Sequence, residues 1–213
     1  MADEIYIFGS LVRGEVGVTS DVDVLVVPIG LKPGGDYPRG WSVYSREVLR
    51  TYHSAGRLFA WHLWLEAKCV FTPLSEAWLQ SLGPPAPYDS FSHDIDDLAT
   101  LLAQSIEQLK AGTSSPIFEV GLVYTTLRDI AMSASARLLA SPSFSTRAPY
   151  LLPFEFPVSE RTYQQAMLAR HSSTRGVAWD GADIGDTVTE LCEAPLARWI
   201  DQLRTELWQP IPS

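Results

Sequence analysis

Hydrophobic and polar positions follow different periods in the two parts of the chain. Near the N-terminus, short runs of β-branched and aromatic residues are bounded by glycine, proline or serine, which is typical of strands joined by turns. These runs predict strands over residues 4–8, 22–27, 41–45 and 68–71. Between the last two strands, apolar residues recur at helical spacing from Arg46 to Glu66 and predict a helix that breaks near Gly56.

After about residue 90 the hydrophobic spacing is helical. Amphipathic segments are predicted at residues 94–112, 117–140, 159–171 and 183–208. Asp94 is expected to cap the first helix, Gly112 to end it, and Pro195 to start or kink the last one. The sequence therefore predicts an α+β fold, with a small mixed β-sheet core and its helices in residues 1–80 and a C-terminal helical bundle in residues 90–213.

The charge of the chain is negative and unevenly distributed. The formal net charge is -9. Residues 1–75 hold eight Asp and Glu against seven Lys and Arg, whereas residues 76–213 hold seventeen against nine. Because binding to a polyanion requires Lys and Arg to displace counterions from phosphates, nucleic acid is not expected as the main partner. A small cationic molecule or a basic partner protein suits the acidic part better.

The N-terminal residues carry no targeting signal that we recognise. Asp3 and Glu4 stand where a secretory signal needs basic residues, and no apolar run approaches the length that spans a membrane. We therefore expect a cytoplasmic protein without a membrane partner.

One stretch, FGSLVRGEVGVTSDVDVLVV at residues 8–27, carries candidate chemistry. Asp21 and Asp23 are two apart in a predicted strand, so their carboxylates should share one face of its N-terminal end. Neighbouring carboxylates stay ionised most easily when a divalent cation bridges them, and oxygen ligands favour Mg²⁺ over zinc. The preceding Gly9-Ser10 turn between a strand and a short helix suits phosphate oxygens.

The spacing of these residues resembles a known family. Gly9-Ser10, ten residues, and then Asp21-Val22-Asp23 give GSx10DxD, a motif of nucleotidyltransferases of the DNA polymerase beta superfamily. The chain is especially similar to the minimal nucleotidyltransferase antitoxins and to the aminoglycoside nucleotidyltransferases with a helical C-terminal domain. The resemblance covers roughly residues 4–72, including the segment RLFAWHLWLEAKCVF.

The resemblance implies a role for each motif residue. Asp21 and Asp23 would ligate Mg²⁺, Gly9 and Ser10 would hold the β- and γ-phosphates of ATP or another nucleoside triphosphate, and Arg13 would approach the phosphates. A hydroxyl of the acceptor would attack the α-phosphorus, with pyrophosphate leaving. In aminoglycoside nucleotidyltransferases a carboxylate of the helical part acts as general base, which makes Glu119 a candidate base here.

One part of the family's pattern is missing. A third carboxylate usually stands on a following strand, where this chain has Ser42 or Tyr44, with Asp36 and Glu47 only flanking that strand. Two hypotheses stay open. The protein is either an active enzyme that moves AMP from ATP onto a hydroxyl of a small molecule or protein, or a catalytically impaired relative that serves as a nucleotide-binding or antitoxin-type partner-binding module. A homodimer is compatible with both.

Overall fold

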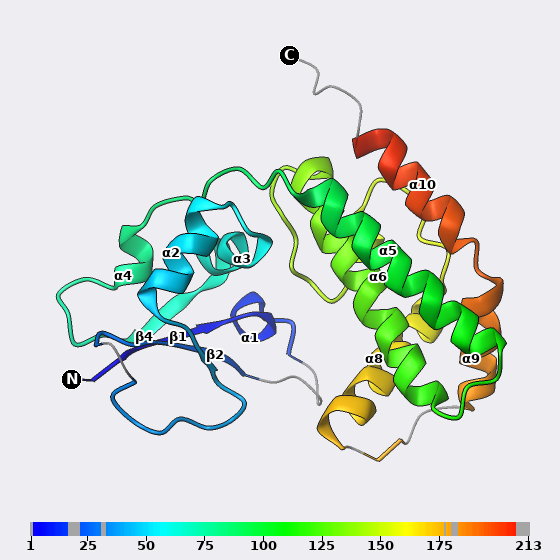
Figure 1. Ribbon diagram of the computed structural model, residues 1–213, viewed down its shortest axis with the longest axis horizontal. Helices are drawn as coiled ribbons and strands as arrows, with labels where there is room; N and C mark the ends of the chain where they lie inside the picture. The colour runs from blue at the N-terminus through cyan, green and yellow to red at the C-terminus, as the bar shows by residue number, and fades with distance from the viewer. Residues whose placement is uncertain (1, 17–21, 31–32, 177, 180–182, 208–213) are drawn as a thin grey trace. The chain divides into compact units, whose positions relative to one another are not determined.

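The chain has an α+β fold, as predicted, and it divides into two compact units. The computed structural model describes residues 2–16, 22–30, 33–176, 178–179 and 183–207 (Figure 1). One unit comprises residues 1–90 with the short segment 144–146, and the other comprises residues 91–143 and 147–213. None of the helices in these described ranges has the length and apolarity to cross a membrane.

The N-terminal unit is built on a four-stranded mixed sheet. Its strands are β1 (Glu4–Phe8), β2 (Asp23–Val27), β3 (Ser42–Val43) and β4 (Lys68–Phe71), in the order β3-β2-β1-β4. β1 runs antiparallel to both β2 and β4, whereas β3 runs parallel to β2. All four strands lie where the hydrophobic runs predicted them.

One face of this sheet is covered by helices. α2 (Arg46–Ser54), α3 (Leu58–Glu66) and α4 (Trp78–Ser81) lie on the same side of the strands (Figure 1). Alternate residues of β1 and β2 face them, because partners in an antiparallel pair point to the same side. The resulting hydrophobic core contains Tyr6, Phe8, Leu25, Val27, Leu49, Leu63, Ala67, Trp78 and Leu79.

A charged residue is buried within this face. Glu4 has no exposed surface, and its carboxylate accepts hydrogen bonds from Arg46 Nη2 at 2.9 Å, the Thr72 hydroxyl at 3.0 Å and the Trp78 backbone N–H at 2.9 Å. A buried carboxylate is tolerated only when it is paired and hydrogen-bonded in this way. The network ties β1 to α2 and to the start of α4.

The predicted break in the helix after β3 is confirmed. α2 ends at Ser54 and α3 begins at Leu58, with Gly56 between them at φ 61°. An added Cβ at Gly56 would lie 2.0 Å from the Pro87 carbonyl oxygen. The indole Nε1 of Trp61 donates to the Ala86 carbonyl at 3.0 Å, so the chain after α4 is held against this turn.

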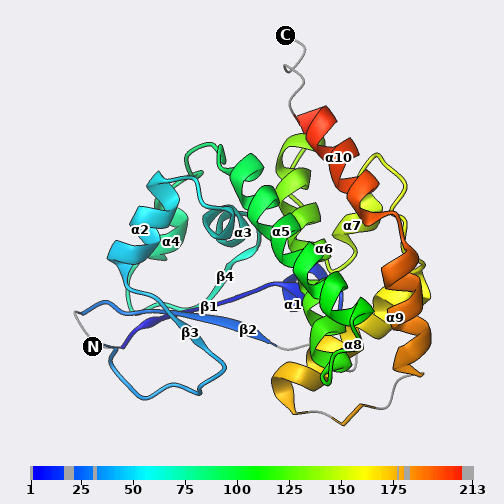
Figure 2. The same ribbon diagram turned by 45° about the vertical axis from the view of Figure 1, so that its right-hand side comes forward.

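The C-terminal unit contains helices and no strand in its described residues. α6 is central, with most of its side chains from Val120 to Ala134 buried, and it contacts both α5 and α8. Figure 2 shows these three helices side by side. The helices of the unit are α5 (Phe91–Lys110), α6 (Pro116–Leu138), α7 (Ala148–Leu151), α8 (Glu160–Arg175), α9 (Ile184–Glu193) and α10 (Leu196–Leu207).

Some helix boundaries differ from the sequence prediction. α5 begins at Phe91, so Asp94 lies in its first turn and is not its cap. Phe91 packs against the hydrophobic core of the unit, which favours one more turn than the polar pattern indicated. The segment 183–208 forms two helices, and the break lies at Pro195, where the sequence predicted a start or a kink. Ala194 before this proline is extended, with φ -59° and ψ 136°.

The start of α8 is capped by two side chains. Ser159 Oγ accepts from the Thr162 N–H at 3.2 Å. Glu190 of α9 accepts from the Ser159 N–H at 2.9 Å and from the Thr162 hydroxyl. Burial alone would raise the pKa of Glu190, but these hydrogen bonds outweigh it and lower that pKa below its usual 4.5.

Candidate functional site

A glycine turn joins β1 to a very short helix. Gly9 has φ 75° and ψ -152°, a conformation that is essentially restricted to glycine. α1 (Ser10–Arg13) follows at once and ends at Gly14, which is left-handed. Ser10 is half-buried, and its hydroxyl makes no hydrogen bond with any residue that the structure describes. Val12 and Arg13 donate their N–H groups to the Gly9 carbonyl at 3.0 and 3.2 Å, whereas Ser10 and Leu11 precede the first hydrogen bond of the helix.

Gly9 lies directly against the carboxylate of Asp23. Phe8 is paired with Asp23 across β1 and β2, and an added Cβ at Gly9 would lie 2.1 Å from Asp23 Oδ2. The absence of a side chain at position 9 therefore makes room for the carboxylate. Asp23 itself is exposed and stands at the first position of β2, on the same face as Leu25 and Val27.

The second aspartate of the motif lies outside the described residues. Asp21 falls in the range 17–21, so its expected place beside Asp23 stays a prediction. Among the described residues, no group of three or more His, Cys, Asp and Glu side chains is placed to hold a metal ion. The Asp23 carboxylate is exposed and lies beside Gly9, and such a hard oxygen donor fits Mg²⁺.

β3 carries no carboxylate. Ser42 pairs with Leu25 and Val43 pairs with Val26 along the parallel edge of β2. Asp36 lies in the loop before β3, and Glu47 is exposed in the first turn of α2. β3 thus has a hydroxyl side chain, Ser42, and an isopropyl side chain, Val43, where the resemblance leads one to expect an acid.

Arg13 is held by two carboxylates. Its Nε donates to Glu15 Oε2 at 2.9 Å and its Nη1 donates to Glu66 Oε2 at 2.6 Å. The same Glu66 oxygen lies 2.9 Å from Nε2 of His62. Sequence reasoning missed Glu66, although its spacing of four residues from His62 on one helix was a signal that the two side chains are neighbours.

The candidate base lies in the other unit. Glu119 is in the first turn of α6 and is half-buried. Its carboxylate makes no hydrogen bond or ion pair with the residues that the structure describes. The structure thus brings Gly9, Ser10 and Asp23 together, while Glu119 belongs to the helical unit.

The family comparison covers the unit that carries the motif. Residues 2–76 match the family model of the nucleotidyltransferase domain. This segment is therefore similar to nucleotidyltransferase domains. It contains the Gly9-Ser10 turn, Asp23 and the Arg13–Glu66 pair, and a nucleotidyltransferase domain supports a general function in nucleotidyl transfer with a nucleoside triphosphate as substrate. No curated protein is significantly similar to the chain.

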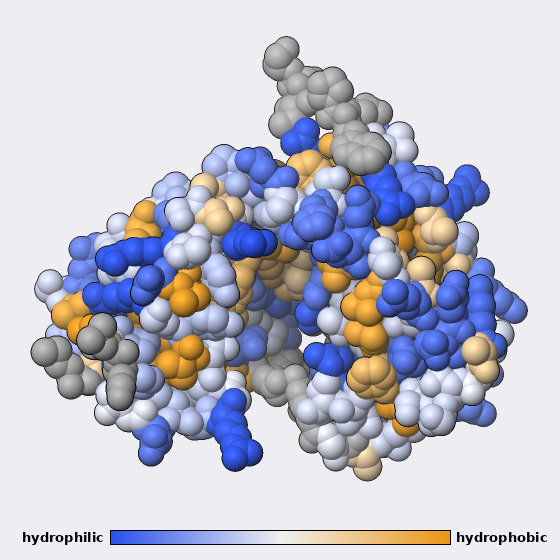
Figure 3. Space-filling model, in the orientation of Figure 1, coloured by the Kyte–Doolittle hydropathy of each residue, from blue (hydrophilic) through white to orange (hydrophobic). Residues whose placement is uncertain are grey.

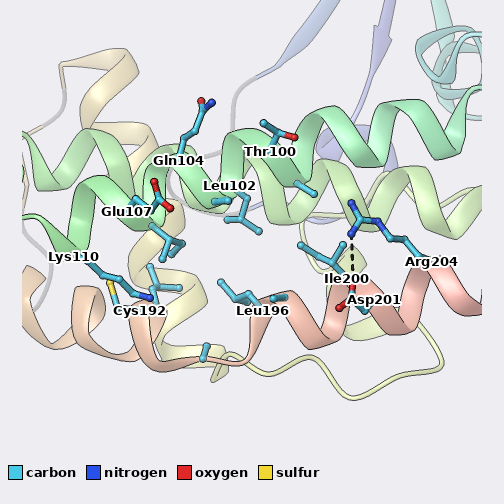
Figure 4. Close-up of a pocket in the computed structure, with 16 residues that line it drawn as sticks. Thr100, Leu102, Gln104, Glu107, Lys110, Cys192, Leu196, Ile200, Asp201 and Arg204 are labelled. Atoms are coloured by element: carbon cyan, nitrogen blue, oxygen red, sulfur yellow. Dashed lines mark hydrogen bonds and ion pairs between the residues drawn. The ribbon is translucent and has the colours of Figure 1, made fainter.

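The C-terminal unit, which the family match does not cover, has a groove on its surface. The groove has a volume of about 590 Å³ and lies between α5, α9 and α10. Leu102, Leu196 and Ile200 project into it (Figure 4). Polar and charged residues from α5 and α10 form its rim, among them Gln104, Glu107, Lys110, Asp201 and Arg204. On the face shown in Figure 3, hydrophilic side chains cover much of this unit.

Proposed function

We propose that the protein is a Mg²⁺-dependent nucleotidyltransferase that moves AMP from ATP onto a hydroxyl of a small molecule or protein. The observation that carries the proposal is the contact between Gly9 and Asp23. The turn at Gly9 leads into a helix, and its backbone N–H groups can bind phosphate oxygens. The Asp23 carboxylate lies against this turn and can bind the Mg²⁺ that neutralises the phosphates. The family match of residues 2–76 supports the same class of reaction.

Each residue of the proposed site has a separate task. Asp21 and Asp23 hold Mg²⁺, which supplies charge neutralisation at the attacking and leaving oxygens when it is bound. The turn at Gly9 and the Ser10 hydroxyl hold the β- and γ-phosphates, and Arg13 adds a positive charge. The acceptor oxygen forms a bond to the α-phosphorus, the bond from that phosphorus to the bridging oxygen breaks, and pyrophosphate leaves. The proton of the acceptor hydroxyl passes to a base, for which Glu119 is our candidate.

The acceptor is expected to be cationic or to lie on a basic protein. Residues 76–213 hold seventeen acidic against nine basic side chains, and such a surface attracts positive charge and repels polyanions. The groove between α5, α9 and α10 has a volume of about 590 Å³, which falls in the range of sites for small molecules. A cationic small molecule and a basic partner protein both remain candidates.

A second function is favoured by β3. Because Ser42 and Val43 occupy the strand beside β2, a domain that holds ATP and Mg²⁺ without a third carboxylate would transfer AMP slowly or not at all. It would then act as a nucleotide-binding or antitoxin-type partner-binding module. This alternative predicts nucleotide binding without covalent transfer.

Transfer of a labelled phosphate separates the two functions. The protein is incubated with Mg²⁺, a cell lysate or a set of cationic aminoglycosides, and ATP labelled at either the α- or the γ-phosphate. The proposal predicts that only the α-label becomes attached to an acceptor, that Asp23→Asn abolishes attachment, and that the loop variant Asp36→Asn retains it. Undiminished attachment by an Asp21→Ala, Asp23→Ala double variant would exclude the mechanism.

A further inference from the structure

The guanidinium of Arg13 is fixed in one orientation before any ligand arrives. Two of its three nitrogens are engaged, Nε by Glu15 at 2.9 Å and Nη1 by Glu66 at 2.6 Å. Its side chain is 18% exposed. An arginine has five N–H donors, so these two contacts leave donors available while they remove most of the side chain's rotational freedom.

Glu66 is itself held firmly. Its side chain is 11% exposed, and one oxygen, Oε2, faces both Arg13 Nη1 and His62 Nε2. The His62 ring stacks on Phe144 with centroids 4.2 Å apart and meets the edge of Phe8 at 5.2 Å. Because the histidine is confined between two aromatic rings, the carboxylate that it contacts has little freedom to move.

This cluster is attached to the candidate site. Phe8, which His62 touches, directly precedes Gly9 and is paired with Asp23. Arg13 ends the four-residue helix that starts at Ser10. The Gly9 turn lies within the six-residue stretch from Phe8 to Arg13. His62 contacts the first residue of this stretch and Glu66 binds the last one, so the cluster is connected to the turn on both sides.

We propose that Glu66 is a positioning residue that holds Arg13 ready for the phosphates of the bound nucleoside triphosphate. The inference rests on the proposed function, and it goes further by assigning a task to a carboxylate outside the motif. A long side chain loses rotamer freedom when it binds a ligand, and this loss weakens binding. A side chain that is already ordered avoids that cost.

The negative charge of Glu66 opposes the binding of phosphates, whereas its orientation of Arg13 favours it. Two variants separate these effects. Glu66→Ala removes both the negative charge and the hydrogen-bond acceptor. Glu66→Gln removes the charge but keeps an oxygen that accepts from Arg13 and His62. If orientation is what matters, Glu66→Ala weakens binding of MgATP about three- to tenfold, whereas Glu66→Gln binds as tightly as the wild type or more tightly.

The experiment is calorimetric titration of MgATP into the full chain and a double-mutant cycle with Arg13→Ala. Glu66 acts through Arg13 in our proposal, so Glu66→Ala should have no further effect once Arg13 is alanine. Titration with AMP should show little effect of either substitution, because AMP lacks the β- and γ-phosphates. Glu76→Ala, at an exposed position of the same unit, is the matched control, and circular dichroism verifies that each variant is folded.

Three results would overturn the inference. If Glu66→Ala binds MgATP like the wild type while Asp23→Asn does not bind, this inference fails and the proposed function stands. If Glu66→Ala weakens MgATP binding by the same factor in the wild type and in Arg13→Ala, the glutamate supports the fold and does not position Arg13. If the wild type itself fails to bind MgATP, the proposed function and this inference fail together.

Discussion

Gly9 and Asp23 are in such close contact that a methyl group at position 9 would lie 2.1 Å from the Asp23 carboxylate oxygen. The two residues are fourteen positions apart in the sequence, and the antiparallel register of β1 and β2 brings them together. A side chain at position 9 would displace the carboxylate. The close approach of the Asp23 carboxylate thus explains why position 9 is a glycine.

Gly9→Ala should therefore damage both stability and binding. We expect a destabilisation of about 1–3 kcal/mol from the backbone conformation, and loss of MgATP binding because Asp23 must move. Gly14→Ala is the matched control, since Gly14 has the same φ of 75° and nothing within 4 Å of an added Cβ. Denaturant unfolding and calorimetry measure the two effects. Equal binding by both variants would show that the contact with Asp23 has no functional role.

Gly56→Ala should destabilise the N-terminal unit strongly. The added methyl would lie 2.0 Å from the Pro87 carbonyl oxygen at a positive φ of 61°, so backbone must move, and we expect a loss above about 2 kcal/mol. Gly83→Ala has a similar φ of 72° in open space and should cost clearly less. The free energies of unfolding in urea compare the two variants, and equal losses would contradict the close approach.

Arg46→Ala should leave a buried charge without its partner. Glu4 has no exposed side-chain surface and pairs with Arg46 at 2.9 Å, and breaking a buried pair from one side costs about 3–5 kcal/mol. Arg50→Ala is the control, because Arg46 and Arg50 both lie over the Trp78 ring, at 5.1 and 5.4 Å, but only Arg46 reaches Glu4. Thermal unfolding of both variants tests the difference, and similar melting temperatures would refute it.

The capping of α8 by Glu190 should make part of the stability depend on pH. The pKa of Glu190 is lowered in the folded protein, so its contribution is fully present above the unfolded pKa of about 4.5 and is lost as pH falls through the lower folded value. At about pH 7, Glu190→Gln should cost about 1 kcal/mol. At about pH 3, the two proteins should differ less. A constant difference across this range would contradict the role of the charge.

Local patterns in the sequence were sufficient for much of the fold. EIYIF and VDVLVV carry β-branched and aromatic residues between turn residues, and both form strands where they were predicted. Gly56 marked the break between α2 and α3 for the same local reason. The predicted start of α5 was wrong, because Phe91 packs against residues distant in the sequence and the helix begins one turn earlier.

The candidate site was predictable only in part. Gly9, Ser10 and Asp23 stand in a fixed spacing, so the motif was sufficient to group them. The pairing of Arg13 with Glu66 joins residues 53 positions apart, and it arises from the packing of α3 on the sheet. No spacing rule in one sequence reports such a contact, which is why the glutamate was not among the predicted site residues.

The central claim is that the turn and Asp23 form a metal-dependent nucleotide site. Calorimetric titration of ATP, with and without Mg²⁺, into the wild type, Asp23→Asn and the control Asp36→Asn tests it most directly. We predict binding that requires Mg²⁺, is abolished by Asp23→Asn and is unchanged by Asp36→Asn. Absence of binding of any nucleoside triphosphate to the wild type, or equal binding by Asp23→Asn, would contradict the claim.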